Sequence, residues 1–240
     1  MKYAFRLGLL VTLTLTVSAC GGGGGAEHHQ AQAQAKGRPL PKYERAVLPA
    51  GQYHTTEFEP SLSFRITGDD WRFEGPSGTL GDPEHPDYLF FEKVPEAEIA
   101  FFNLRKVKGV YKARGQNRPL AAGAGEIEPV PALDELIAWF QHHPYLKTSK
   151  PEPATVGGFK GVRFDVVTAN LQKKDSQVFI FALSTGGPSE VFILKQEHFI
   201  VLKNVKGVPV VIQYNDLKDN FDEFAPVAEK VLQSVEWTGS

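Results

Sequence analysis

Residues 177–214, QVFIFALSTGGPSEVFILKQEHFIVLKNVKGVPVVIQY, decide the fold class of this chain. Three segments within it are apolar throughout: Val178–Leu183, Val191–Leu194 and Phe199–Leu202. Short turns are predicted between them, at Ser184–Ser189 and Lys195–Glu197. Uninterrupted apolar runs of this length, bounded by turns, predict strands that are covered on both faces of a sheet.

The same pattern of strands continues on both sides of this stretch. Asn204–Gly207 is predicted to be a hairpin turn that leads into a strand at Val208–Tyr214. Pro209 suits the start of that strand or a sheet edge, because proline cannot donate to a ladder. Further strands are predicted upstream at Tyr53–Phe58, Leu62–Ile66, Trp71–Phe73, Tyr88–Phe91, Ile99–Leu104, Val107–Tyr111 and Val162–Thr168.

Two segments have the apolar spacing of a helix. In residues 132–143, large apolar side chains recur every three or four positions and form one stripe. A second stripe predicts a helix over Phe221–Val235, capped by Asn220 or Asp222, with Pro226 in or near its first turn. Strands and helices together predict an α+β fold. We expect one domain, residues 47–240, with a mainly antiparallel sheet flanked by helices on both faces.

The first 46 residues indicate export and attachment. Residues 1–19 combine a positive start with an apolar core that is too short to span a membrane, as in a signal peptide. Val17-Ser18-Ala19-Cys20 resembles the lipobox of bacterial lipoproteins, in which the cysteine receives a diacylglyceryl group and becomes the new N-terminus. The resemblance implies lipidation of Cys20. Residues 20–46, rich in Gly, Ala and Gln, are predicted to be a flexible tether.

Composition excludes several classes of partner. The formal net charge is −2, and removal of Lys2 and Arg6 with the signal peptide makes the chain more acidic. Such a chain has no electrostatic basis for binding nucleic acid, so none is expected as a partner. With 42% apolar and 11% aromatic residues, the chain can form a core. Cys20 is the only cysteine, so that core rather than disulfides must stabilise the fold.

Three stretches resemble PsbP-like domains. Leu62–Trp71, LSFRITGDDW, is similar to the strand and tryptophan that open those domains. The helix at 132–143 with Val156–Gly161, VGGFKG, and the ending Phe224–Trp237, FAPVAEKVLQSVEW, are similar to later parts of the family pattern. The resemblance covers roughly residues 50–238. It implies an α/β/α sandwich used as a binding or assembly module, and it carries over no site residue and no cofactor.

No motif of a known catalytic or cofactor site occurs: there is no Gly-x-Ser-x-Gly, no P-loop and no His-Glu-x-x-His. We therefore predict no catalytic activity, no cofactor and no metal. A serine triad could be assembled from Ser176 or Ser184, His198 and some aspartate, but any chain of this size permits such a combination by chance. Two acidic loops, 82–87 and 215–222, are either cation sites or solvated loops.

Two histidine pairs have simpler interpretations. His28–His29 lies in the predicted tether, where one dipeptide cannot fix a coordination geometry. His142–His143 lies at the end of a predicted helix, where the two side chains diverge and complement the helix C-terminus.

The leading hypothesis is a lipid-anchored binding or assembly domain on the extracytoplasmic face of the cell membrane. Its partners would be the membrane, through Cys20, and an unknown protein of the cell envelope. One alternative is a carrier of a small apolar or lipidic ligand, which requires a cavity around Phe140, Phe164 and Phe181. The other is an envelope hydrolase, which requires a nucleophile, a base and an orienting residue within hydrogen-bond reach.

Overall fold

The computed structural model describes residues 37–41, 45–55, 57–75, 87–112, 126–170, 177–184 and 188–238. These residues belong to one compact unit, Lys36–Ser240, while the other unit, Met1–Ala35, lies outside the described residues. The predicted signal peptide and Cys20 therefore also lie outside them. Within the described residues, no helix has the length and apolar character needed to cross a membrane.

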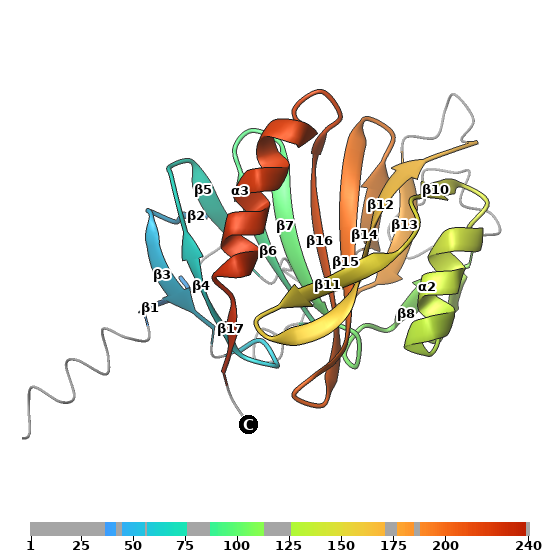
Figure 1. The fold of residues 1–240 in the computed structure, drawn as a ribbon, viewed down its shortest axis with the longest axis horizontal. Helices are drawn as coiled ribbons and strands as arrows, with labels where there is room; N and C mark the ends of the chain where they lie inside the picture. The colour runs from blue at the N-terminus through green and yellow to red at the C-terminus, as the bar shows by residue number, and fades with distance from the viewer. Residues whose placement is uncertain are drawn as a thin grey trace, which may run out of the picture. The chain divides into compact units, whose positions relative to one another are not determined.

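A nine-stranded sheet forms the centre of the unit (Figure 1). Its neighbouring strands all pair antiparallel, and the hairpin of β15 and β16 lies in its middle. The order is β10 (Leu146–Thr148), β12 (Phe159–Thr168), β15 (Lys195–Val205), β16 (Val208–Leu217), β7 (Ala97–Asn103), β6 (Tyr88–Lys93), β5 (Trp71–Gly75) and β2 (Ala46–Val47), with β11 (Glu152–Val156) also paired to β12.

Two four-stranded sheets complete the strands of the described residues. One has the order β1 (Arg38–Pro39), β3 (Gly51–His54), β4 (Leu62–Ile66) and β17 (Glu236–Trp237). The other has the order β14 (Pro188–Phe192), β13 (Gln177–Ala182), β8 (Gly109–Tyr111) and β9 (Ile127–Glu128). Only β1 and β3 pair parallel among the described strands, so the predicted mainly antiparallel α+β fold is confirmed.

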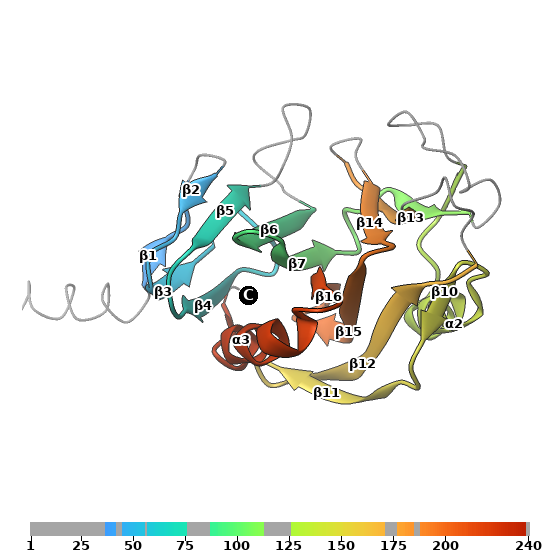
Figure 2. The same cartoon turned by 90° about the horizontal axis from the view of Figure 1, so that it is seen from above.

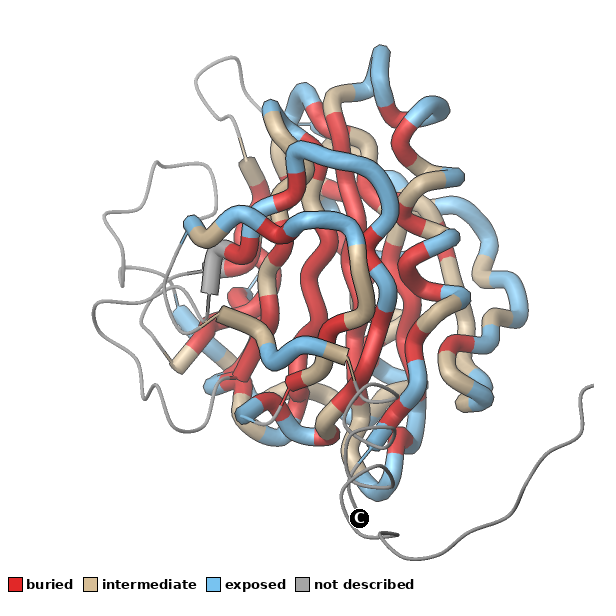
Figure 3. Tube along the Cα trace, turned by 90° about the vertical axis from the view of Figure 1, so that its left-hand side faces the viewer, coloured by how far each residue is buried: buried red, intermediate tan, exposed pale blue. Residues whose placement is uncertain are grey.

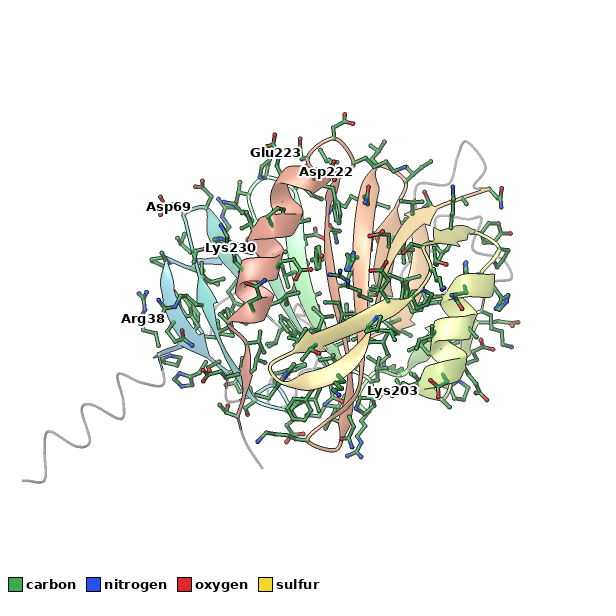
Figure 4. All side chains as sticks on the ribbon, in the orientation of Figure 1. Arg38, Asp69, Lys203, Asp222, Glu223 and Lys230 are labelled. Carbon is green, nitrogen blue, oxygen red and sulfur yellow. The ribbon has the colours of Figure 1, made fainter. Side chains whose placement is uncertain are left out.

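The described residues form two helices, α2 (Leu133–His142) and α3 (Phe221–Gln233). Both begin with acidic residues, which the helix dipole favours there. Figure 4 shows Asp222 and Glu223 at the start of α3, with Lys230 farther along the helix. Asn220 is the N-cap of α3 but makes no side-chain cap hydrogen bond. The predicted side-chain capping of this helix is therefore wrong.

Pro226 lies beyond the first turn of α3, deeper in the helix than predicted. A proline has no N–H, so the carbonyl of Asp222 loses its usual partner four residues on. The helix nevertheless continues to Gln233, held to the sheet by the buried side chains Phe224, Val231 and Leu232.

Side chains alternate along β15 between two hydrophobic cores. Ile200 and Leu202 pack in the core that contains the buried residues of α3, whereas Phe199 and Val201 pack in the core that contains those of α2. Figure 2 shows the sheet curving around α3, with α2, β8, β13 and β14 on the other side. The central strands are consequently buried along most of their length, while turns are exposed (Figure 3). The prediction of cover on both faces is confirmed for Val178–Leu183 and Phe199–Leu202, whereas Ile193 and Leu194 of the third apolar run are exposed.

One predicted turn is in fact a buried strand. The strand predicted at Val191–Leu194 ends at Phe192, and the turn falls at residues 193–194, where Leu194 is 68% exposed. The predicted turn at Lys195–Glu197 is instead the start of β15. The charges of these residues indicate a solvated turn, but both Lys195 and Glu197 are buried because they pair with other polar groups of the sheet.

The folded unit also begins earlier than predicted. Arg38 and Pro39 form β1 and pair with Tyr53 and His54 of β3, inside the range 20–46 predicted to be tether. Arg38 is held further because its guanidinium lies 5.0 Å from the centre of the Tyr53 ring.

The end of the chain packs against a hairpin turn. Trp237 of β17 is buried, and its Nε1 donates a hydrogen bond to the carbonyl oxygen of Val156 at 3.1 Å. Gly157 follows with φ +55°, and a Cβ there would clash with the Trp237 ring. The described part of the chain thus closes on a buried strand residue.

Candidate functional site

A row of polar residues crosses the centre of the nine-stranded sheet. Glu98 of β7 pairs with Asn215 of β16, which pairs with Glu197 of β15. All three lie on the face that carries Phe199 and Val201, and therefore continue the α2-side core. A polar row in such a place is costly unless its groups bond one another.

Glu197 is fully buried, and both of its carboxylate oxygens accept hydrogen bonds. Oε1 accepts from the backbone nitrogen of Phe192 at 3.2 Å, and Oε2 accepts from Nε2 of Gln213. Burial raises the pKa of Glu197 well above its ordinary value, and the nearby carboxylate of Glu98 raises it further. The two hydrogen bonds and Lys195 oppose this shift because they favour the ionised form.

Glu98 is paired on both oxygens as well. The Nζ of Lys195 lies 2.9 Å from Oε1, and Nδ2 of Asn215 donates to Oε2 at 2.9 Å. Lys195 is almost fully buried, and its Nζ also lies 5.5 Å from the centre of the Phe192 ring. This buried ammonium therefore compensates one of the carboxylates.

The amide of Asn215 is fixed by this contact. Since Glu98 can only accept, the group bonded to it must be the nitrogen, and Oδ1 lies on the other side of the amide. Oδ1 is buried and has no hydrogen-bond partner among the described residues. Asn215 as a whole is 3% exposed. The sheet thus leaves one buried acceptor unpaired.

Strand β14 covers the polar row through side chains of the sheet. Gln213 donates from Nε2 to the carbonyl oxygen of Glu190 at 3.2 Å, and Glu197 accepts from the Phe192 nitrogen. Two backbone groups of β14 are thereby bonded to side chains of β15 and β16. These contacts position Glu190 over the polar row.

A cavity of about 240 Å³ lies between β14 and the polar row and is partly enclosed. Its described lining combines polar and apolar residues. The polar residues are Glu98, Ser189, Glu190, Gln213 and Asn215, and the apolar residues are Tyr88, Phe90, Ala100, Phe102, Leu183 and Phe192. Burial raises the pKa of Glu190 to about 7, and the nearby Glu98 carboxylate adds to the shift. A carboxyl group here can change charge near neutral pH.

A second hollow, of about 590 Å³, lies between α3 and strands β11 and β12. His198 lines it and bonds through Nδ1 to Oδ1 of Asp165 at 2.8 Å, with Tyr214 stacked on the imidazole at 4.8 Å. The Tyr214 hydroxyl donates to Glu229 at 2.9 Å. His198 Nε2 is buried and has no hydrogen-bond partner among the described residues. Among the described residues, Asp165 orients the His198 imidazole, but no hydroxyl group is hydrogen-bonded to the free nitrogen of that ring.

The triad predicted as a possibility is not assembled. Ser184 follows β13 on the α2 side, where its backbone nitrogen donates to Oδ2 of Asp87, whereas His198 faces the α3 side. A serine on one face of the sheet cannot reach a histidine on the other. Ser176 lies outside the described residues.

The two acidic loops also separate. Of residues 82–87 only Asp87 is described, and it is buried and bonded to Ser184. In 215–222, Asn215 belongs to the cavity, while Asp216 on the opposite face accepts from its neighbour Leu217. No group of three His, Cys, Asp or Glu side chains suited to a metal ion occurs among the described residues.

The histidine pair at the end of α2 diverges as predicted, but only one member behaves as expected. Exposed His142 bonds through Nδ1 to the carbonyl oxygen of Ala138 at 2.8 Å. His143 is 4% exposed and packs against Trp139, with ring centres 4.7 Å apart and planes tilted by 58°, and burial lowers the pKa of its imidazole to about 4. A neutral His143 does not complement the helix dipole as a cation. His28–His29 lies outside the described residues.

The space required for a lipid carrier is filled by side chains. Phe140 is fully buried, with ring centres 5.3 Å from Phe164, 6.4 Å from Phe181 and 4.9 Å from Phe199. Rings at these distances are in contact and leave no room for an apolar ligand. The packing argues against a carrier site at this position.

The cavity was not predicted from the sequence, because Lys195–Glu197 has the composition of a turn. The sequence does contain one signal. Lys195, Glu197, Phe199 and Val201 occupy every second position and therefore lie on one face of a strand. That alternation is typical of a strand whose apolar face becomes polar at one end.

Comparisons with known proteins give only distant similarities. No family model matches this chain, and no curated protein matches it. Among solved structures, it is similar to PsbP of the cyanobacterium Synechocystis sp. PCC 6803, with a TM-score of 0.38 and 9% identity over 80% of this chain and 96% of that one. It is also similar to LpqN of Mycobacterium tuberculosis, described as involved in cell envelope biogenesis, with a TM-score of 0.34 and 12% identity over 82% and 91% of the two chains. Similarities of this size do not assign a function.

Proposed function

We propose that this protein is a lipid-anchored binding domain on the extracytoplasmic face of the cell membrane, with no catalytic activity of its own. Its scaffold would be a PsbP-like α/β/α sandwich, and its binding site the cavity between β14 and the polar row. Its partner would be a protein of the cell envelope, which would either bind at this cavity or supply the ligand that the cavity holds.

The observation that supports binding is the unpaired Oδ1 of Asn215 in a residue that lines the cavity. Roughly 90% or more of buried polar groups have a hydrogen-bond partner in protein or ordered water. Leaving an acceptor unpaired costs about 1 to 3 kcal/mol. A solute that donates to Asn215 recovers this free energy, which makes the cavity selective for donors.

The same hydrogen bonds support binding over catalysis. Both oxygens of Glu197 and both oxygens of Glu98 are already engaged by donors of the fold. Carboxylates held in this way are fixed in position by the fold, and a proton transfer to them would have to compete with these donors. Glu98, which lines the cavity, and Glu197 beside it therefore shape the site.

The anchor is supported by the sequence Val17–Cys20 and by its place ahead of the folded unit, which begins at Lys36. Each buried methylene of an acyl chain contributes about 0.8 kcal/mol, so two chains hold a protein durably where one holds it marginally. The membrane attachment of the whole chain would thus depend on one thiol.

The anchor is tested by expressing the full chain in a bacterial host with an alkyne analogue of palmitate. Wild type should be labelled and recovered with membranes, and Cys20→Ser should lose both properties. Ser18→Ala keeps a small residue before the cysteine and is the matched control. A Cys20→Ser protein that is still labelled or still sediments with membranes contradicts the anchor.

The binding role is tested by adding a small solute to the folded protein and following the side-chain amide resonances of Asn215 and Gln213. Benzylamine, benzyl alcohol and benzoate have one ring each and differ in charge. At least one of them should shift these resonances saturably. Ala100→Leu, which fills the cavity from β7, should abolish the shift; saturable shifts that survive Ala100→Leu contradict binding in this cavity.

The alternative of an envelope hydrolase has one observation in its favour, the hydrogen bond between His198 and Asp165. If this pair were catalytic, wild type would hydrolyse p-nitrophenyl acetate faster than His198→Ala at equal concentration. We expect equal rates, because His198 Nε2 carries no nucleophile among the described residues.

A further inference from the structure

The charges around the cavity are unbalanced toward the negative. Two glutamates, Glu98 and Glu190, line it, and Lys195 is the one cation that the described residues place beside them. Lys195 is committed to Glu98 at 2.9 Å. A buried site with more carboxylates than cations attracts a positive ligand more strongly than a neutral or negative one.

The aromatic residues of the lining, which together form an aromatic wall, suit the apolar body of such a ligand. Phe102 stacks with Tyr88 with 6.1 Å between ring centres, and Phe90 and Phe192 complete this aromatic wall. Aromatic faces attract cations through the ring quadrupole and also bury hydrocarbon. Phe192 already has an ammonium beside it, that of Lys195.

We propose that this cavity binds a small organic ammonium ion with an apolar body no larger than about one ring, held between Glu190, Asn215 and the aromatic wall. The inference rests on the proposed binding role of the same cavity and adds the chemical class of the ligand. Ammonium N–H groups donate to the Glu190 carboxylate and to Oδ1 of Asn215, the acceptor left unpaired by the sheet. Lys195 stays with Glu98.

Asn215 favours a ligand that donates hydrogen bonds over an anion or a group that can only accept them. Its Nδ2 is bound to Glu98, so the part of the amide that remains is an acceptor. Ligands that only accept hydrogen bonds cannot satisfy it. A carboxylate ligand would also face Glu190 and Glu98 at close range, which is repulsive.

Binding is expected to depend on pH through Glu190. The groups that face this carboxyl are Glu98 from β7 and Tyr111 from β8, with Lys195 and Glu197 behind them on β15. Glu190 has a pKa of about 7 in the free protein. A neighbouring ammonium favours its ionised form, so affinity for an ammonium should increase between about pH 6 and about pH 8.

The test is a titration of the whole folded protein with benzylamine, benzyl alcohol and benzoate at about pH 8, where Glu190 is ionised, followed by calorimetry and by the Asn215 amide resonance. Benzylamine should bind about tenfold more tightly than benzyl alcohol, and benzoate should not bind. Glu190→Gln, which keeps shape and removes charge, should lower benzylamine affinity about tenfold and abolish its pH dependence. Asn215→Leu should lower it as well; if Asn215→Leu does not fold, Glu190→Gln carries the test.

Each other outcome has a distinct meaning. If benzyl alcohol or benzoate binds as tightly as benzylamine in the cavity, the ammonium ligand is excluded while the binding role stands. If calcium or magnesium chloride displaces benzylamine stoichiometrically, the site is one for an inorganic cation and the inference is overturned. If none of the three solutes shifts the Asn215 resonance, the binding role fails together with the inference.

Discussion

The indole ring of Trp237 lies against the backbone of Gly157, and its Nε1 is bonded to the carbonyl oxygen of Val156 at 3.1 Å. This contact connects the last strand of the chain to the turn between β11 and β12, far from it in sequence. Because Trp237 also contacts Phe101 of β7, with ring centres 6.2 Å apart, the C-terminus is part of the α3-side core.

Gly157→Ala should destabilise the protein by about 2 kcal/mol or more, because the added Cβ meets the Trp237 ring and a positive φ is strained for alanine. Gly158→Ala is the matched control: φ is +83° there, but nothing lies within 4 Å of a Cβ. It should cost about 1 kcal/mol, the backbone strain alone. Urea denaturation of both variants measures the difference, and equal losses would show that the ring contact contributes nothing.

Glu190→Gln should change how stability depends on pH. Since the folded pKa of Glu190, about 7, is above the ordinary 4.5, the folded state holds a proton that the unfolded state releases. Wild type therefore loses stability relative to Glu190→Gln as pH rises from about 4.5 to about 7. Full burial would make this about 3 kcal/mol, and solvent screening reduces it to about 1 to 2 kcal/mol. Chemical denaturation across this range measures it; a constant difference contradicts it.

His143 should give the opposite slope. Its folded pKa of about 4 lies below the ordinary 6.5, so the unfolded state takes up a proton that the folded state refuses. The full contribution of His143 to stability is present above about pH 6.5. It is lost as the pH falls to about 4, and the loss then amounts to about 3 kcal/mol. His143→Asn keeps an acceptor for the Tyr145 nitrogen and should remove this loss. Parallel stability curves for the two proteins would mean that His143 titrates normally.

Phe140→Ala should create a cavity where wild type has none. The loss of a fully buried phenylalanine costs about 3 to 5 kcal/mol. Benzene should then stabilise Phe140→Ala against thermal unfolding more than it stabilises wild type, because it fills the new space. Phe140→Leu, with a smaller loss, is the control. Equal stabilisation of Phe140→Ala and wild type by benzene would contradict a new cavity at this position.

The strands of this protein could be predicted because their apolar side chains decide their faces. The predicted strands Val178–Leu183, Phe199–Leu202 and Val208–Tyr214 correspond to β13, which ends at Ala182, and to β15 and β16, and the stripe at residues 132–143 corresponds to α2. The ends of the helices were less predictable, because a helix can begin with or without a side-chain cap. Asn220 has a side chain suited to capping, yet the backbone geometry alone starts α3.

The cavity was beyond sequence reasoning because its parts are brought together by register. Glu98 and Asn215 are 117 positions apart and meet only because β7 pairs with β16 in one particular alignment. Glu197 is charged, and charge in a short segment between apolar runs predicts a turn. Only the partners Gln213 and Phe192, which the fold supplies, make its burial possible.

The four-stranded sheet of β1, β3, β4 and β17 has a consequence for how the protein is made. Its strand β4 is translated long before its partner β17, which holds residues 236–237. Until β17 emerges, the edge of β4 that lies away from β3 is unpaired, and Trp237 does not yet cover Gly157. The unit therefore closes only once residues 236–237 have been synthesised, whichever compartment it folds in.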